Sequence, residues 1–212
     1  MQVYQLYYNE QSKKNCFKES IHIECPNLTK ESIWVTREFP LFENHKIIEC
    51  SKEFNDTDKY GVLSHAFFNK ARCNYDKLLQ LSNMGSDIVT FNRIAKGRNI
   101  LLHLDQYHGN GTSKLFIDLM EATNLPINKV STVAYSNYFL ARGDIYKDYV
   151  NTWLIPFCNE ILSPKWDDRT YVNSNYKKAI REKGCDYPLH PFLIERLFSL
   201  YLANNNYKII EQ

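Results

Sequence analysis

The chain has 212 residues, of which 44% are hydrophobic, 14% aromatic and 24% charged. Its 26 lysines and arginines nearly balance 24 aspartates and glutamates, so the formal net charge is +2, and no concentrated basic stripe of the kind that binds nucleic acid is visible. These totals predict a single folded domain over residues 1–212, and they exclude a disordered chain and argue against a nucleic-acid partner.

The first predicted element is a strand in "QVYQLYY", residues 2–8, because its β-branched and aromatic residues favour extended backbone. We expect this strand to end in a polar loop at residues 9–12. The stretch 13–58 gives the weakest signals. It contains turn residues and, in "ESIWVTREFPLF", a candidate helix that ends before Pro40.

Strands and helices then alternate. "YGVLSHAFFNKA" (Tyr60–Ala71) begins as a buried strand, "NYDKLLQLSNMG" is a short helix that stops at Gly85, and "DIVTFN" is a strand. The apolar run of "NILLHLDQYHGNG" (Asn99–Gly111) fits a helix or a strand equally well, and it leads into a glycine-rich loop.

The C-terminal half begins with an amphipathic helix, "SKLFIDLMEATNL". "VAYSNYFLARGDIYKDYVNTWLIPF" (residues 133–157) then starts like a buried strand and becomes a helix from about Asp144, with a kink expected at Pro156. "HPFLIERLFSLYLANNN" is the last helix, and "YKII" is a candidate edge strand. This alternation predicts an α/β fold with a mixed, mainly parallel sheet flanked by helices.

Ligands of such sheets bind outside the carboxyl ends of the strands, so polar residues at strand ends are candidate site residues. The first strand ends in Tyr7, Tyr8, Asn9 and Glu10, which could stack a base and hold a ribose, or could form a half-exposed strand end. His65 follows the next strand. A single histidine there is more often structural than catalytic.

Two further groups of residues contain side chains of the kinds that bind metal ions. Asp56-Thr57-Asp58 has the spacing of carboxylates that hold Mg²⁺ or Mn²⁺ for a nucleotide diphosphate, but it precedes a strand, so we interpret it as a turn. His103, Asp105 and His108 could bind a metal or act as acid and base if the segment is extended. Their spacing matches no well-defined metal family, and His108, expected in the loop, is the candidate catalytic residue.

Two C-terminal segments carry polar residues in apolar surroundings. Ser136 and Asn137 interrupt the expected strand, and an unpaired buried amide costs about 1–3 kcal/mol, so they need partners or a function. Glu195 lies in a narrow polar strip of an otherwise apolar helix. A partly buried carboxylate there must pair, with Arg196 as the nearest candidate, or have a raised pKa.

The six cysteines contain no C-x-x-C pair, and the N-terminus "MQVYQLYYNE" lacks the pattern of a secretion signal. No apolar run reaches the roughly 18 residues of a membrane span. We therefore expect a cytoplasmic protein with reduced thiols and no zinc site, although peripheral association with a membrane stays open. The cysteines are Cys16, Cys25, Cys50, Cys73, Cys158 and Cys185.

Three of these pieces, "GVLSHAFFNKA", "SNYFLARGDIYKDYVNTWLIPF" and "HPFLIERLFSLYL", resemble, in this order, segments of a family of small bacterial proteins of capsule and lipopolysaccharide loci. From Tyr60 onward the sequence resembles that family, which is related to GT-A glycosyltransferases. The resemblance implies a compact GT-A-like fold and transfer of a sugar from a nucleotide donor to a cell-surface polysaccharide or lipopolysaccharide precursor. It implies that Asn137 lies in the cleft and Glu195 near the acceptor.

From this combination we expect Glu195 and His108 to be catalytic. A divalent metal is possible but is not supported by a D-x-D after an apolar strand, so no metal ligand is predicted. The alternatives are a non-catalytic glycan- or protein-binding module on the same fold, and a metal-dependent hydrolase. The expected substrate-binding residues are Tyr7, Tyr8, Asn9, Glu10, His65, Asp105, Ser136, Asn137 and Arg196.

Overall fold

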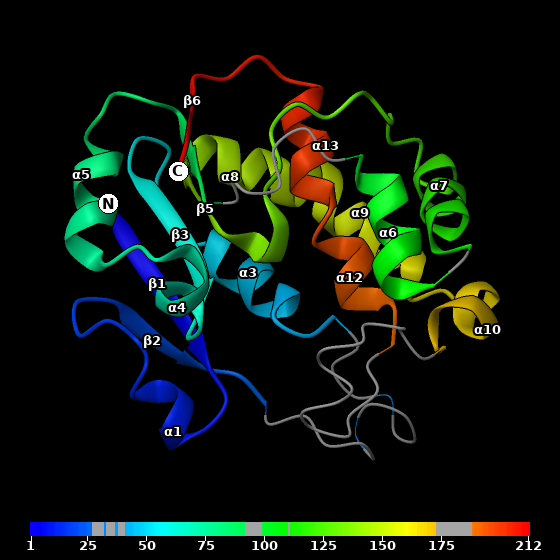
Figure 1. Cartoon of the computed structure of the whole chain (residues 1–212), viewed down its shortest axis with the longest axis horizontal. Coiled ribbons are helices and arrows are strands. Elements are labelled where there is room, and N and C mark those ends of the chain that lie inside the picture. Colours follow the sequence, from blue (N-terminus) through cyan, green and yellow to red (C-terminus); the bar gives the residue numbers. More distant parts are fainter. Residues whose placement is uncertain (27–31, 33–36, 38–40, 92–98, 110, 173–187) are drawn as a thin grey trace.

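The computed structural model describes residues 1–26, 32, 37, 41–91, 99–109, 111–172 and 188–212 (Figure 1). The candidate helix in "ESIWVTREFPLF" falls almost entirely outside these residues, as does Cys185. None of the helices in the described part of the chain combines the length and apolar character of a membrane-spanning segment.

A six-stranded sheet organises the fold. Five strands run in the same direction, and β5 is antiparallel to both of its neighbours, β3 and β4. The prediction of an α/β fold with a mixed, mainly parallel sheet is therefore confirmed. In spatial order the strands are β2 (Ile21–Glu24), β1 (Gln2–Tyr7), β3 (Lys59–Ser64), β5 (Phe139–Arg142), β4 (Ile88–Thr90) and β6 (Ile209–Glu211).

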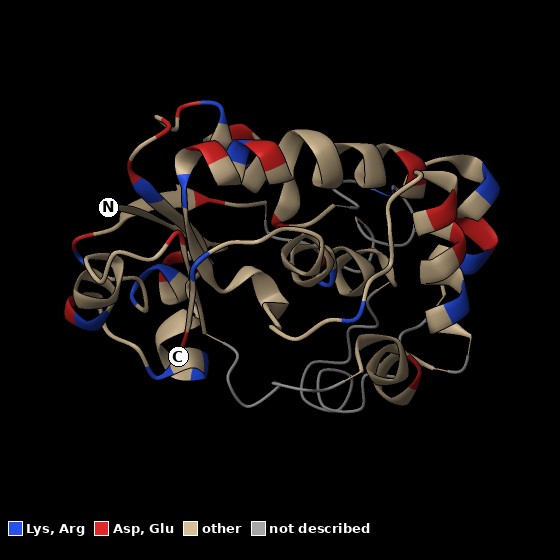
Figure 2. Cartoon of the chain, turned by 90° about the horizontal axis from the view of Figure 1, so that it is seen from above, with Lys and Arg blue, Asp and Glu red and all other residues tan. Residues whose placement is uncertain are grey.

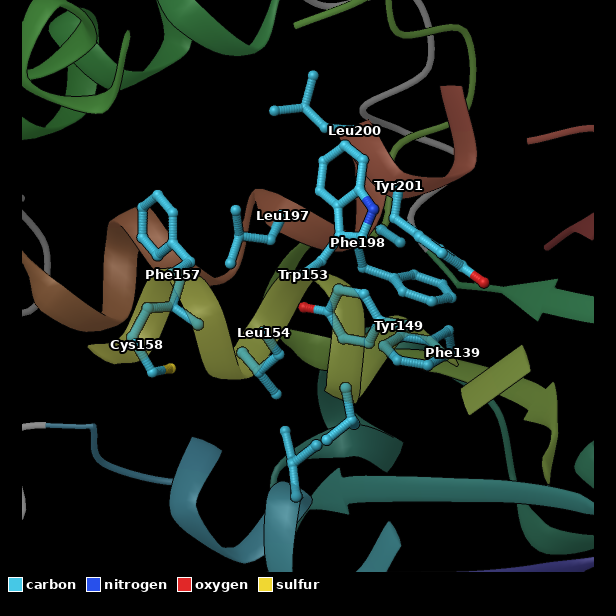
Figure 3. Close-up of a cluster of buried hydrophobic side chains, with 14 of the residues drawn as sticks. Phe139, Tyr149, Trp153, Leu154, Phe157, Cys158, Leu197, Phe198, Leu200 and Tyr201 are labelled. Carbon is cyan, nitrogen blue, oxygen red and sulfur yellow. The ribbon is translucent and has the colours of Figure 1, made fainter. Parts of the chain in front are cut away.

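Helices cover both faces of the sheet. α4 (Phe67–Ala71) and α5 (Tyr75–Ser82) pack on one face through a small core that includes Leu63, Leu78 and Leu140. The other face carries a larger core, in which Phe139 of β5 stacks on Phe198 with their ring centroids 3.5 Å apart (Figure 3). Burial on both sides accounts for the largely apolar central strands.

The larger core is built by the remaining long helices, several of which lie beside the sheet as a helical layer (Figure 1). They are α3 (Asn44–Ser51), α6 (Ile100–His108), α7 (Thr112–Ala122), α8 (Gly143–Tyr149), α9 (Ile155–Ile161), α12 (His190–Ile194) and α13 (Leu197–Ala203). Two short helices, α1 (Glu10–Lys13) and α10 (Asp167–Thr170), lie at the periphery.

The irregularity expected at Pro156 is a wide turn of π-helix at Val150–Leu154, which joins α8 to α9. The backbone N–H of Ile155 donates to the carbonyl of Val150, five residues back. Proline has no N–H and crowds the carbonyl four residues before it, so a widened turn at this point keeps the helix continuous. The widened segment also directs Trp153 and Leu154 into the core.

The last helix is not continuous, in contrast to the sequence prediction. A turn at Glu195 and Arg196 separates α12 from α13. In a regular helix the N–H of Arg196 would donate to the carbonyl of Phe192, but the guanidinium of Arg196 donates to that oxygen instead, at 2.8 Å, and the N–H donates to Leu193. The break turns the side chains of Glu195 and Arg196 toward the residues described next.

Positively and negatively charged positions are interspersed over the described residues, without a continuous stripe of one sign (Figure 2). The five described cysteines are free, and four of them are buried. Burial raises the pKa of the Cys25 thiol to about 12 and that of Cys73 to about 11. Thiols in such surroundings are inert nucleophiles and poor metal ligands.

Candidate functional site

A strained turn lies at the carboxyl-end edge of the sheet, immediately before β5. Ser136 and Asn137 have φ values of 58° and 56° in a short 3₁₀ turn over Tyr135–Asn137. The left-handed conformation costs about 1–2 kcal/mol per residue, although asparagine tolerates it better than most. Two consecutive non-glycine residues in this region persist only where the surroundings hold them, and such outliers gather at functional sites.

The expectation that Ser136 and Asn137 lie inside a strand is therefore wrong, because β5 begins only at Phe139. The turn is joined to two neighbouring strand ends. Tyr138 shares a hydrogen bond with Ser64, at the end of β3, over 2.8 Å between the hydroxyl oxygens, and its carbonyl accepts from the N–H of Phe91 just after β4. The polar side chains of the turn thus lie where ligands of α/β sheets bind.

On one side, the turn contacts the break between α12 and α13. Ser136 Oγ donates to Glu195 Oε2 at 3.3 Å, and the other oxygen of Glu195 accepts from the Arg196 guanidinium. Arg196 is 1% exposed, and its guanidinium stacks over the ring of Tyr135 with 4.7 Å to the centroid. The buried cation and its carboxylate compensate one another, as a buried charge requires.

Two histidines complete the surroundings of Arg196. The guanidinium Nη2 lies 3.0 Å from His103 Nδ1 and 3.2 Å from His108 Nε2. Arginine can only donate, so both ring nitrogens must be acceptors and the proton of each neutral ring lies on the other nitrogen. Burial, and then the charge of Arg196, lower the pKa of His108 to about 3. His108 ends α6, is 3% exposed and stacks on Phe192, so it is not the loop residue expected from the sequence.

Asp105 does not join these histidines. The segment is helical, so residues two apart point in different directions, and the condition for a shared face of His103 and Asp105 is not met. The Asp105 carboxylate accepts from the backbone N–H of Ser113 at 2.9 Å and from its hydroxyl, which ties α6 to the start of α7. Among the described residues, no group of three metal-ligating side chains is present.

On its other side, the turn contacts α3 and the end of β1. Asn137 Nδ2 donates to Asn44 Oδ1 at 3.3 Å. Glu43, the residue before Asn44, accepts a hydrogen bond from the hydroxyl of Tyr8 at 2.7 Å. His65 meets the Tyr8 ring edge-on with 5.8 Å between centroids. Burial raises the pKa of Glu43, and the Tyr8 hydrogen bond and the more distant charge of Lys70 oppose that rise.

The rest of the first strand end has other roles. Tyr7 is buried on a different side, where Lys13 lies 5.2 Å from its ring centroid. The predicted loop at residues 9–12 is instead the start of α1, and Asn9 caps this helix by accepting from the N–H of Ser12 at 2.9 Å. The side chain of Glu10 is 83% exposed and pairs loosely with Lys13.

The sequence-predicted residues thus form two groups joined by the turn. Ser136, Glu195, Arg196 and His108 make one group, and Tyr8 and His65 belong to the other. Sequence reasoning missed Glu43 and Asn44, which lie in the stretch 13–58, where the sequence signals are weakest. An acid just before a helix and an amide at its first position look like an ordinary helix start, so no local signal marks them.

The Asp56-Thr57-Asp58 motif lies at the opposite edge, just before β3. Asn55 Oδ1 accepts from the N–H groups of Thr57 and Asp58 at 3.1 and 2.8 Å, and Asp56 pairs with Lys147. The motif is a turn, in agreement with the interpretation from the sequence.

Comparison with solved structures finds a likeness to the apo structure of the bifunctional glycosyltransferase WbbM, with a TM-score of 0.45 and 17% sequence identity. It covers 100% of this chain and 44% of that chain, so the protein spans less than half the length of the structure it matches. The likeness is distant and concerns the fold alone. No protein-family model matches the sequence, and the search of curated proteins gives no match.

Proposed function

We propose that this protein is a glycosyltransferase-like protein that moves a sugar from a nucleotide donor to a precursor of a bacterial surface polysaccharide or lipopolysaccharide. One observation carries the proposal. Two motifs of the sequence resemblance, 59 residues apart, meet through the hydrogen bond between Ser136 and Glu195. The mixed sheet with its reversed β5 is consistent with the GT-A-like fold that the resemblance implies.

The chemistry of this edge suits a sugar. Hydroxyl groups are recognised by carboxylates, amides and hydroxyls fixed by their own surroundings, and aromatic rings lie close by. Glu195 is held at both oxygens, by Arg196 and by Ser136, with its side chain 21% exposed. A fixed, partly exposed carboxylate can accept a hydrogen bond from an acceptor hydroxyl and orient it. His108 then serves to position Arg196.

A thermal-shift screen of the purified protein against nucleotides and nucleotide sugars tests the donor. Ligand that binds only the folded state stabilises it, by about 2.7 kcal/mol at a concentration of 100 times Kd. We expect at least one nucleotide sugar to raise the Tm and its nucleotide alone to raise it less. Calorimetry then gives the affinity. A wild-type protein that binds no nucleotide sugar would overturn the proposal.

Glu195→Gln tests the acceptor side. The substitution is nearly isosteric but removes the charge that compensates buried Arg196, so we expect a lower Tm, unchanged affinity for the nucleotide sugar and transfer reduced by about tenfold or more through a raised acceptor KM. Glu121→Gln, at an exposed position on α7, is the matched control and should behave as wild type. Binding of the donor without transfer by the wild type would favour the non-catalytic module.

A further inference from the structure

Glu43 is a half-buried carboxylate at the carboxyl-end edge, immediately before α3. The Tyr8 hydroxyl donates to its Oε1 at 2.7 Å, and this is the one hydrogen bond of the Glu43 side chain within the described residues. The next residue, Asn44, contacts the strained turn through Asn137. Glu43 therefore adjoins the same turn that Glu195 contacts from the other side.

The two carboxylates have opposite surroundings. Glu195 has a guanidinium on one oxygen and a hydroxyl on the other, so its charge is compensated and each oxygen already accepts one hydrogen bond. Glu43 makes no ion pair in the described part of the chain, and Lys70 acts on it only from a longer distance. Within the described residues Oε2 of Glu43 accepts no hydrogen bond, so it can accept one from a substrate hydroxyl. Of the two, Glu43 is in the surroundings that favour uptake of a proton.

We infer that Glu43 is the group that takes the proton from the acceptor hydroxyl, and that Tyr8 holds it in place. This inference rests on the proposed sugar transfer. The acceptor oxygen forms a bond to the anomeric carbon of the donor sugar while its proton passes to the Glu43 carboxylate. The bond from that carbon to the phosphate oxygen breaks, and its electron pair leaves with the nucleotide. Glu43 then releases the proton to water.

The pH dependence of transfer tests this role. A base must be ionised, so the turnover of the wild type should rise with pH through the pKa of Glu43, which lies above its ordinary value. The same shift makes the folded chain hold a proton that the unfolded chain has released, so stability should fall as pH rises through this range. Glu43→Gln should lose both dependences, and its turnover should fall by about 10²–10⁴-fold while the nucleotide sugar still binds.

Tyr8→Phe gives a second, milder test. The Tyr8 hydrogen bond lowers the pKa of Glu43, so its removal should move the rising limb of the pH profile to higher pH and leave a working base. Glu195→Gln is the matched comparison, because it should raise the acceptor KM and keep the rising limb. The probe throughout is the nucleotide sugar that stabilises the wild type in the thermal-shift screen.

The outcomes separate the two proposals. A Glu43→Gln variant with wild-type turnover, or with the rising limb intact, overturns the role of Glu43 and leaves sugar transfer standing. If Glu43→Gln does not fold, an unchanged pH profile in Tyr8→Phe overturns it instead. A wild type that binds no nucleotide sugar, or binds one without transfer, overturns the proposed transferase activity, and the base assignment with it.

Discussion

Charged residues lie at both ends of the parallel strands. We call these ends the amino-end edge, where β3 and β4 begin, and the carboxyl-end edge, where they end, and the charged residues interact differently at the two. At the amino-end edge, Arg142 lies between Asp144 and Asp87, with nitrogen–oxygen distances of 2.7 and 2.8 Å, and its side chain is 40% exposed. The hydrogen bond from Arg142 lowers the pKa of Asp144. Exposed pairs of this kind contribute about 0–1 kcal/mol each, and their effect here is to hold turns together.

At the carboxyl-end edge the charges are buried or half-buried, and the backbone is strained. Arg196 is 1% exposed, and the pKa of Glu43 is raised by burial where that of Asp144 is lowered by a partner. Environment, more than residue type, thus distinguishes a candidate site from a structural turn, and acids in a familiar spacing are the less informative signal.

The largest effect on stability should come from substitution of Gly143, which lies in close contact with neighbouring backbone at the amino-end edge. An ideal Cβ at this position would lie 1.7 Å from the backbone oxygen of Asn55. Since backbone must move to admit it, Gly143→Ala should lower the free energy of unfolding by about 3 kcal/mol, measured with urea. Donor affinity of the folded protein should not change, because the contact is at the opposite edge from the strained turn.

Gly85→Ala is the control for Gly143→Ala. Gly85 has a φ of +64° and open space around it, so the added methyl group meets no atom and only the backbone conformation is penalised, by about 1 kcal/mol. Equal losses in the two variants would show that the close approach to Asn55 does not constrain the amino-end edge.

At the strained turn we expect a smaller effect on stability and a clear effect on transfer. Ser136→Gly relieves a left-handed residue, worth about 1 kcal/mol, and gives up one hydrogen bond to Glu195, worth about as much. Stability should therefore change by less than about 1 kcal/mol in urea, while the acceptor KM rises severalfold. The control is Asn124→Gly, at an exposed left-handed position after α7, which should leave transfer unchanged. If Ser136→Gly lowered the stability and left transfer normal, the role of the turn would be structural.

The sequence predicts the central strands and most helices because their apolar periodicity is local. β3 and β4, for example, are short apolar runs between turn residues, and both were placed correctly. β2 was missed because its alternation of isoleucine with polar residues extends over only four residues, which are exposed or half-buried. The break in the last helix was missed for another reason. It depends on contacts of Arg196 with α6, which lies 88 or more residues earlier in the chain.

The same distinction holds for the candidate site. Ser136 and Glu195 were found because polar residues in apolar segments are visible locally, although their contact is not. The aromatic content around Ser136 is typical of a strand, and the left-handed turn follows from tertiary contacts on both sides. Glu43 becomes notable only through Tyr8, 35 residues away, so no local pattern could have identified it.

The smallest effect on stability and donor affinity should come from substitution of Asp56, the first acid of the D-x-D motif at the amino-end edge. Its side chain is 68% exposed and pairs with Lys147 on the surface, so Asp56→Asn should change the free energy of unfolding by no more than about 0.5 kcal/mol. If the motif held a divalent cation for the donor, loss of one carboxylate would weaken nucleotide-sugar binding in Mg²⁺ or Mn²⁺ far more than in chelator. We expect calorimetry to give the wild-type affinity in both conditions, as for Asp76→Asn on α5. A metal-dependent loss in Asp56→Asn alone would move the candidate site to the amino-end edge and reverse the comparison between the two edges.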